Sequence, residues 1–239
     1  MTPDHVINPL DAWYPHEPDL AAAQLAWLQT NVGSDHTLLD LGCGAGRTLV
    51  PMAQYGASCT GVDRDDAALL TCRQALEQSG ASANLVLDDF CTWLPKAEGA
   101  WDVILCLGNT FCLIWQIEEA IALLTAVRRH LAPGGRLIVD DIPGDLWPEL
   151  IEGRWQAGLD PDHGLQMVWS ADDSVFTLRD EARADSENWE IGPEDVPLRL
   201  WTAGALHLAA IASGFEVPLV PAGSGVRVLR PVPQDHSSS

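Results

Sequence analysis

The chain has little positive charge. Its 239 residues carry 13 Lys and Arg against 34 Asp and Glu, a formal net charge of −21. Nucleic-acid backbones and anionic membranes are bound through clustered Lys and Arg, so neither is an expected partner. No apolar run approaches the roughly 20 residues of a membrane span. Met1–Leu10 lacks the basic and apolar regions of a signal peptide, so we expect a cytoplasmic protein.

The cysteines follow no metal or redox spacing. There are six, and none forms a C-x-x-C pair. Cys59 and Cys106 lie within apolar stretches, which indicates buried thiols in a reducing compartment and no metal site or disulfide framework. What the chain has in quantity is apolar side chains, at 47%. That amount suits the core of one α/β domain with an insertion.

Apolar stretches alternate with helical patterns along most of the chain. Strands are predicted near 37–41, 58–62, 84–88, 103–107 and 136–140, and helices near 46–54, 66–79 and 117–130. This alternation indicates right-handed crossovers and a parallel sheet. A helix at 203–212 and strands near 215–220 and 225–229 would complete seven strands. The predicted fold class is α/β, Rossmann-like and doubly wound, with a mostly parallel seven-stranded sheet.

Residues 142–198 interrupt this alternation. Gln166–Trp169 and Val175–Leu178 are predicted to pair as an antiparallel hairpin, so a small β insertion follows the fifth strand. A helix is expected from Leu20, with Asp19 as its N-cap. The predicted organisation is a helical cap at 1–36, a core at 37–141 and 199–230, a substrate lid at 142–198 and a disordered tail at 231–239.

One glycine-rich turn is the main candidate for a binding site. Leu38–Gly46 runs from an apolar strand into the pattern G-x-G-x-G. Glycine has no Cβ and tolerates positive φ, so a ligand can approach this backbone closely. The following helix, from about Arg47, would point free N–H groups at that ligand. Arg47 stands where a dinucleotide fingerprint has Gly or Ala, which argues against a pyrophosphate ligand.

The turn resembles the first motif of the class I S-adenosylmethionine (SAM) dependent methyltransferases. Four further segments are similar to the family in the same order, namely 59–64, 85–90, 101–111 and 131–141. The resemblance covers residues 37–141 and extends weakly to 199–230. It implies SAM as the cofactor, S-adenosylhomocysteine as the product and a small-molecule acceptor. The sequence leaves a monomer and a homodimer both open.

The resemblance also implies roles for several side chains around the cofactor. Asp63 would accept hydrogen bonds from the ribose, with Arg64 beside the adenine. Asp89 would accept from the adenine amino group, with Phe90 packed on the ring. A helix N-cap for Asp63 and a surface acid for Asp89 are the structural alternatives. The other expected cofactor-binding residues are Asp40, Gly42, Cys43, Gly44, Gly46, Arg47, Leu107 and, closing over SAM, Tyr14.

Asn109 is the leading acceptor-side candidate because it follows the fourth strand, beside the expected methyl position. Gly108–Phe111 resembles the Gly-Asn-Ser-Phe segment of glycine and sarcosine N-methyltransferases, where the Asn touches the substrate. An ordinary turn residue is the structural alternative. Asp141 is a second catalytic candidate that would hold a cationic amine or take up its proton. Arg179 is a substrate-binding candidate that would pair with a carboxylate.

The histidine positions bear on the acceptor atom. Transfer to oxygen needs a base, whereas an amine needs only to be unprotonated, and positioning supplies much of the acceleration. No His falls just after a core strand end, so an amine nitrogen is favoured. Three alternatives remain: an O- or C-methyltransferase of natural-product metabolism, a nicotinamide-dependent oxidoreductase, and a SAM-binding protein without transfer activity.

Overall fold

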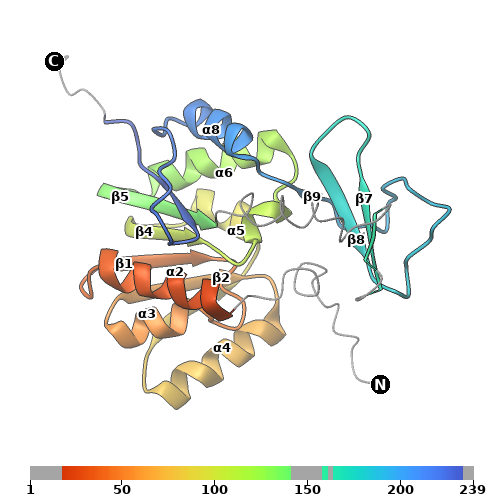
Figure 1. Ribbon diagram of the computed structural model, residues 1–239. Helices are drawn as coiled ribbons and strands as arrows, with labels where there is room; N and C mark the ends of the chain where they lie inside the picture. The colour runs from red at the N-terminus through yellow and green to blue at the C-terminus, as the bar shows by residue number, and fades with distance from the viewer. Residues whose placement is uncertain (1–17, 141–157, 161–163, 234–239) are drawn as a thin grey trace.

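The computed structural model describes residues 18–140, 158–160 and 164–233. Its centre is a six-stranded sheet in the order β10-β5-β4-β1-β2-β3 (Figure 1). β10 runs antiparallel to β5, and all other pairs are parallel. The α/β, Rossmann-like, mostly parallel sheet is therefore confirmed. The strands are β1 (Thr37–Leu41), β2 (Ser58–Asp63), β3 (Ala83–Leu87), β4 (Trp101–Cys106), β5 (Leu131–Asp140) and β10 (Val226–Leu229).

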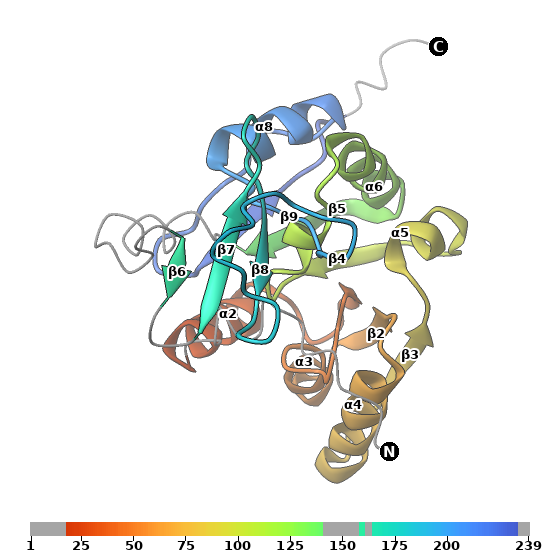
Figure 2. The same ribbon diagram turned by 90° about the vertical axis from the view of Figure 1, so that its right-hand side faces the viewer.

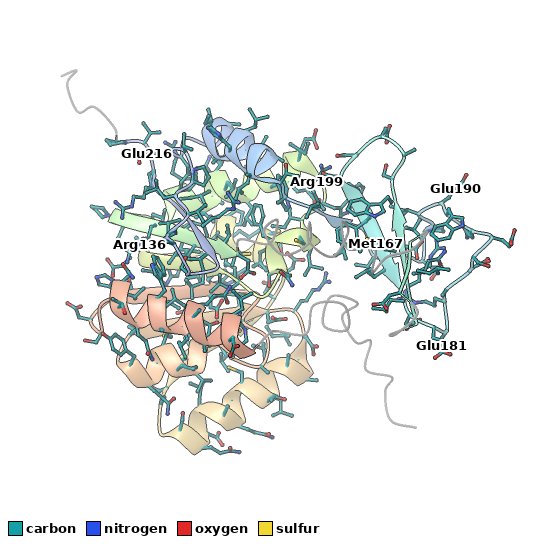
Figure 3. The ribbon with its side chains drawn as sticks, in the orientation of Figure 1. Arg136, Met167, Glu181, Glu190, Arg199 and Glu216 are labelled. Atoms are coloured by element: carbon teal, nitrogen blue, oxygen red, sulfur yellow. The ribbon has the colours of Figure 1, made fainter. Side chains whose placement is uncertain are left out.

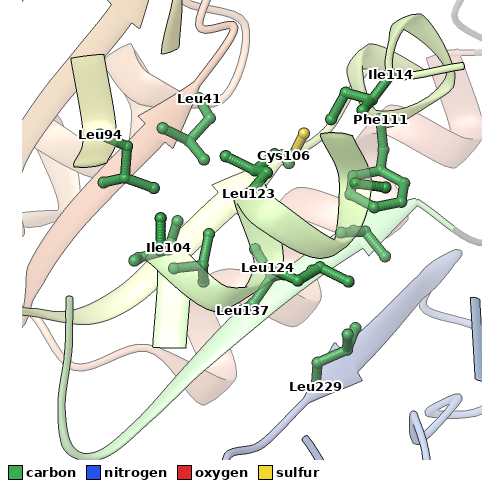
Figure 4. Close-up of a cluster of buried hydrophobic side chains, with 14 of the residues drawn as sticks. Leu41, Leu94, Ile104, Cys106, Phe111, Ile114, Leu123, Leu124, Leu137 and Leu229 are labelled. Carbon is green, nitrogen blue, oxygen red and sulfur yellow. The ribbon is translucent and has the colours of Figure 1, made fainter. Parts of the chain in front are cut away.

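Helices cover both faces of this sheet, which explains why its central strands are apolar on both sides. Because side chains alternate along a strand, Leu38 packs toward one face and Leu39 toward the other. Figure 4 shows the second face, where the buried cluster includes Ile104 of β4 and Leu124 of α6. On the first face lie α2 (Pro18–Asn31), α3 (Leu49–Tyr55) and α4 (Asp66–Ser79), and on the second α5 (Phe90–Trp93), α6 (Ile117–Arg129) and α8 (Ala203–Ala212).

Two helix starts refine the sequence predictions. Asp65 caps α4, since its carboxylate accepts from the backbone N–H groups of Ala67 and Ala68. The expected N-cap at Asp19 was wrong, because α2 begins at Pro18 and Asp19 lies in its first turn. A carboxylate in that turn still interacts favourably with the helix dipole.

The expected strand at 215–220, which would have been the seventh, does not form a regular strand at the edge of the sheet. Residues 215–220 make only isolated bridges, from Phe215 to Pro231 and from Leu219 to Val228. Pro218 has no backbone N–H to donate, which interrupts a regular ladder here. Six strands form the large sheet in the described part of the chain.

The Pro133–Gly135 turn lies within β5 and not before it. The pairing with β4 shifts between Trp101–Leu131 and Val103–Arg136, so the four residues 132–135 lie opposite Asp102 alone and bulge out of the strand. The predicted strand near 136–140 is the part of β5 beyond this bulge.

The insertion forms a second, antiparallel sheet in the order β6-β7-β8-β9. Its centre is the predicted hairpin, in which Gln166 pairs with Arg179 and Trp169 with Phe176. The small sheet stands to the right of the large one in Figure 1 and faces the viewer in Figure 2. Its strands are β6 (Leu159–Asp160), β7 (Leu165–Trp169), β8 (Val175–Arg179) and β9 (Leu198–Arg199).

Candidate active site

The glycine turn after β1 presents one open position. Gly42, Gly44 and Gly46 have φ values of 74°, 51° and 86°, which L side chains rarely adopt. A Cβ at Gly42 would clash with the side chain of Thr110, and one at Gly46 would lie 2.6 Å from Cys72 Sγ. At Gly44 no atom lies within 4 Å of the Cβ position. The turn therefore packs against the protein at its ends and faces open space at Gly44.

Asp63, at the end of β2, supports this turn directly. Its Oδ2 accepts a hydrogen bond from the Gly44 N–H at 2.7 Å, and its Oδ1 accepts from the Asp65 N–H at 2.9 Å. Asp63 is not the cap of α4, since Asp65 takes that place. The half-buried carboxylate stands beside the open glycine, where a ligand with hydroxyl groups can reach it.

Asp40 is a buried acid on the α2 side of β1, and 3% of it is exposed. Burial raises its pKa to about 7, and the nearby carboxylates of Asp63 and Asp140 act in the same direction, while Arg47 opposes them. The Cys43 thiol is also buried, and burial raises its pKa, so it stays protonated. Cys43 packs beneath the turn and is not a nucleophile.

Asn109 directly follows Gly108 beyond β4 and has an unusual backbone. At φ 61° and ψ 10° it adopts the left-handed conformation, alone among non-glycine residues in the described ranges. Asn tolerates this conformation better than most residues. Its N–H donates to Asp140 Oδ2 at 2.6 Å, and the Thr110 hydroxyl donates to the Leu107 carbonyl at 2.8 Å. The short 3-10 turn η2 (Thr110–Leu113) begins immediately after it.

Two residues of this site were not predicted, Asp140 and Gln24. Gln24 Nε2 donates to Asp140 Oδ1 at 2.8 Å, and Gln24 Oε1 accepts from Arg47 Nη1 at 3.2 Å. Burial raises the pKa of Asp140, although the hydrogen bonds from Asn109 and Gln24 oppose this. The periodicity of the sequence could have indicated both residues. Gln24 lies one helical turn before the buried Leu28, and the alternation of β5 turns Asp140 toward the α2 face.

The second acidic strand end lies on the same edge as the turn. The Asp88 N–H donates to the Asp63 carbonyl at 3.0 Å, which brings the ends of β2 and β3 together. Asp89 caps the short helix α5 by accepting from the Cys91 N–H at 2.8 Å. Phe90 is half-buried and packs against the core, and Arg64 is exposed. Tyr14 and Asp141 lie outside the described residues.

In the structure Arg179 makes contacts within the insertion. It is 4% exposed, and its guanidinium donates to both Asp195 carboxylate oxygens, at 3.0 and 2.7 Å. It also donates to the carbonyls of Asn188 and Glu190, at 2.8 and 2.7 Å. Arg179 therefore ties the loop 180–197 to the small sheet. These bonds use four of the five guanidinium N–H donors and favour a structural role, and the binding of a substrate carboxylate by Arg179 stays a prediction.

The insertion is anchored to the turn that follows β4. Within η2, Phe111 packs into the core cluster, while the neighbouring Cys112 packs into the apolar cluster of the small sheet. The turn that starts at Asn109 thus lies between the two sheets. The small-sheet cluster also contains Leu165, Met167, Phe176, Leu178, Leu198 and Leu200.

Arg199 is the polar part of that anchor. Its two terminal nitrogens donate to the two oxygens of Asp173, at 2.8 and 2.6 Å, and its guanidinium lies 5.6 Å from the ring centroid of Trp201. Figure 3 shows Arg199 between the large sheet with its helices and the small sheet that carries Met167.

Within the described ranges, no group of three or more His, Cys, Asp and Glu side chains could hold a metal ion. In that same part of the chain, no helix has the length and apolar character needed to cross a bilayer.

The sequence is similar to those of known methyltransferases. Residues 38–135 match the family described as "Methyltransferase domain". The chain is 34% identical over 122 residues to cypemycin N-terminal methyltransferase of a Streptomyces species, which covers 50% of this chain and 47% of that protein. It is 28% identical over 141 residues to a ubiquinone biosynthesis O-methyltransferase of Pseudomonas paraeruginosa. That match covers 59% of this chain and 53% of that protein. The chain thus spans about half the length of these curated relatives.

The fold is also similar to solved structures. The CcbJ methyltransferase of Streptomyces caelestis superposes with a TM-score of 0.61 at 19% identity, over 90% of this chain and 96% of that one. Residues 38–135 match a methyltransferase domain, the fold is that of solved methyltransferases, and together these findings indicate SAM as the cofactor. The site fits such a ligand, because open space at Gly44 lies beside the Asp63 carboxylate.

Proposed function

We propose that the protein transfers the methyl group of SAM to a small molecule, at an amine nitrogen. The observation that carries this proposal is the contact between the glycine turn and the turn after β4. A Cβ at Gly42 would clash with the side chain of Thr110, so the Thr110 side chain packs directly against the backbone of the glycine turn. They follow β1 and β4, where the strand order reverses and ligands bind in such sheets. Donor and acceptor can therefore meet beside Asn109.

In methyl transfer from SAM to an amine, the main task of the protein is to position the two reactants. SAM, when bound, supplies an electrophilic methyl group on a sulfonium. The nitrogen–carbon bond forms as the carbon–sulfur electrons return to sulfur, and the amine sheds a proton. The Asn109 amide can donate to the acceptor or accept from its N–H, which orients the nitrogen lone pair. We keep Asp141, the residue after β5, as the proposed companion that takes up the proton.

Nitrogen is preferred over oxygen because the described part of the site holds no histidine that could act as the base for a hydroxyl. His36 precedes β1 and accepts from the Gly33 N–H, and His130 precedes β5 and contacts the Gly99 carbonyl, so both lie at the opposite edge of the sheet. His207 is on α8. The cypemycin relative is named as an N-terminal methyltransferase, and a polypeptide N-terminus carries an amine. The resemblance of Gly108–Phe111 to glycine and sarcosine N-methyltransferases also favours nitrogen.

An oxygen acceptor is the second candidate, because the ubiquinone-pathway relative is named as an O-methyltransferase. For either acceptor we propose that residues 142–198 act as a lid. The packing of Cys112 into the small-sheet cluster supports this, since it places the described part of the insertion against the acceptor turn.

The test combines an acceptor screen with two variants at one position. Amines, phenols and carboxylic acids are screened for SAM-dependent methylation, and Asn109→Gly and Asn109→Ala are compared with the wild type. Glycine keeps the left-handed turn and removes only the amide, whereas alanine adds backbone strain. Both should lower turnover roughly tenfold to a thousandfold, with SAM affinity nearly unchanged.

Three results would count against the proposal. Normal turnover in Asn109→Gly would remove Asn109 from the acceptor site. SAM binding without methylation of any acceptor class would favour a SAM-binding protein without transfer. Methylation of phenols alone would favour the oxygen acceptor.

A further inference from the structure

A chain of hydrogen bonds joins the glycine turn to the turn at Asn109 through Gln24 and Asp140. It runs from Arg47 Nη1 to Gln24 Oε1 at 3.2 Å, from Gln24 Nε2 to Asp140 Oδ1 at 2.8 Å, and from the Asn109 N–H to Asp140 Oδ2 at 2.6 Å. Arg47 follows the glycine turn, Gln24 lies on α2, and Asp140 ends β5. Three separate elements therefore converge on the turn at Asn109.

The direction of every bond in this chain is set by chemistry. Arginine only donates, so the oxygen of Gln24 must face Arg47 and its NH₂ must face Asp140. The backbone N–H of Asn109 also only donates. Asp140 thus receives a donor on each oxygen, and only a carboxylate accepts at both. Asparagine would turn an NH₂ toward one of the two donors.

The packing leaves these side chains little room to rearrange. Gln24 is 4% exposed and donates a further hydrogen bond to the Gly225 carbonyl at 3.2 Å. A Cβ at Gly225 would clash with the side chain of Leu20, so this loop lies directly against α2. Val226 pairs with Asp140 across β10 and β5, which fixes the strand end as well.

We infer that Asp140 is a positioning residue that holds Asn109 in its left-handed turn, and that Gln24 ties this turn to the glycine turn. Methyl donor and acceptor are thereby kept in one fixed arrangement. The role of the arrangement in catalysis rests on the proposed function. Its structural part, that the carboxylate at 140 holds the turn, can be measured without an acceptor.

The test is Asp140→Asn in the full chain, with turnover, SAM affinity and amide exchange measured together. We expect exchange at Asn109 and the η2 amides to rise at least about tenfold with S-adenosylhomocysteine present, because the turn loses an acceptor. Turnover should fall roughly tenfold to a hundredfold, while the dissociation constant for SAM changes by less than about threefold.

Asp102→Asn is the matched control. Asp102 Oδ2 accepts from the N–H and the hydroxyl of Thr37, both at 2.8 Å, and Asp102 lies on β4 near the start of the strand, away from the turns. This variant should lose thermal stability and keep turnover and Asn109 exchange. Gln24→Met, which keeps the side-chain length without the amide, replaces Asp140→Asn as the test if the latter fails to fold.

Unchanged exchange at Asn109 in Asp140→Asn would overturn the inference, whatever the turnover. Faster exchange with normal turnover would overturn its catalytic part. If the wild type binds no SAM, the proposed function fails, and exchange measured on the free protein still decides whether Asp140 holds the turn.

Discussion

Gly44→Ala separates cofactor binding from folding at the centre of the glycine turn. The Cβ position at Gly44 has no atom within 4 Å, so alanine meets no protein atom there. Gly44 has a φ of 51°, and a left-handed backbone costs an alanine about 1–2 kcal/mol of stability. The same methyl group enters the space where we place the cofactor. Overpacking a fitted site costs roughly 1–3 kcal/mol, which is roughly a 5- to 150-fold loss of SAM affinity.

Gly80→Ala supplies the matched control. Gly80 ends α4 with a φ of 68°, and its Cβ position also has no atom within 4 Å. Gly80→Ala therefore has a similar free-energy cost for the left-handed backbone, at a position far from the glycine turn. Gly46→Ala differs from both, because its Cβ would lie 2.6 Å from Cys72 Sγ and should cost further stability.

The assay is calorimetric titration with SAM and S-adenosylhomocysteine, alongside thermal unfolding of each variant. Gly44→Ala and Gly80→Ala should lower the melting temperature by similar amounts, and only Gly44→Ala should weaken both ligands. Wild-type affinity in a folded Gly44→Ala protein would show that the open face of the turn does not contact the cofactor. Equal weakening in Gly80→Ala would show that the loss comes from the fold.

Further predictions concern the acids and the arginines. Asp63→Ala should weaken SAM and S-adenosylhomocysteine equally in titrations, by about 1.5–3 kcal/mol, because the Gly44 N–H and the ribose lose one acceptor; a change in stability alone would make Asp63 purely structural. Asp40, with a pKa raised by burial from 3.8 to about 7, binds more protons folded than unfolded between these values, so the free energy of unfolding should fall as pH rises from about 4 to 7 and then level off. Asp40→Asn should flatten that slope in thermal unfolding, and a slope that persists would have another source. Arg179→Met should cost on the order of 3 kcal/mol of stability, because it leaves the Asp195 carboxylate unpaired, and should leave SAM affinity within about twofold; an acceptor KM that rises without loss of stability would support the binding role. Arg199→Met should loosen the small sheet and lower turnover with SAM affinity unchanged, whereas full turnover would argue against the lid.

The sequence alone was enough to predict the parts of the site that are formed by residues close together in the chain. The three glycines of the turn need positive φ, and Asp63 follows a strand that must lie beside β1, so pattern and spacing placed them together. The hairpin at 166–178 and the helix at 203–212 were predicted for the same reason, because alternation and capping residues act over a few positions.

Tertiary structure decided what depends on contacts between distant segments. The alternation of β5 turns Asp140 toward α2, but only the packed fold shows that Gln24, 116 residues earlier, donates to it. From the sequence alone Arg179 could have bound a ligand. In the fold its guanidinium N–H groups donate to acceptors in the loop 180–197. A polar side chain is defined by the partner it meets, and when that partner is far along the chain only the packed fold determines which one it is.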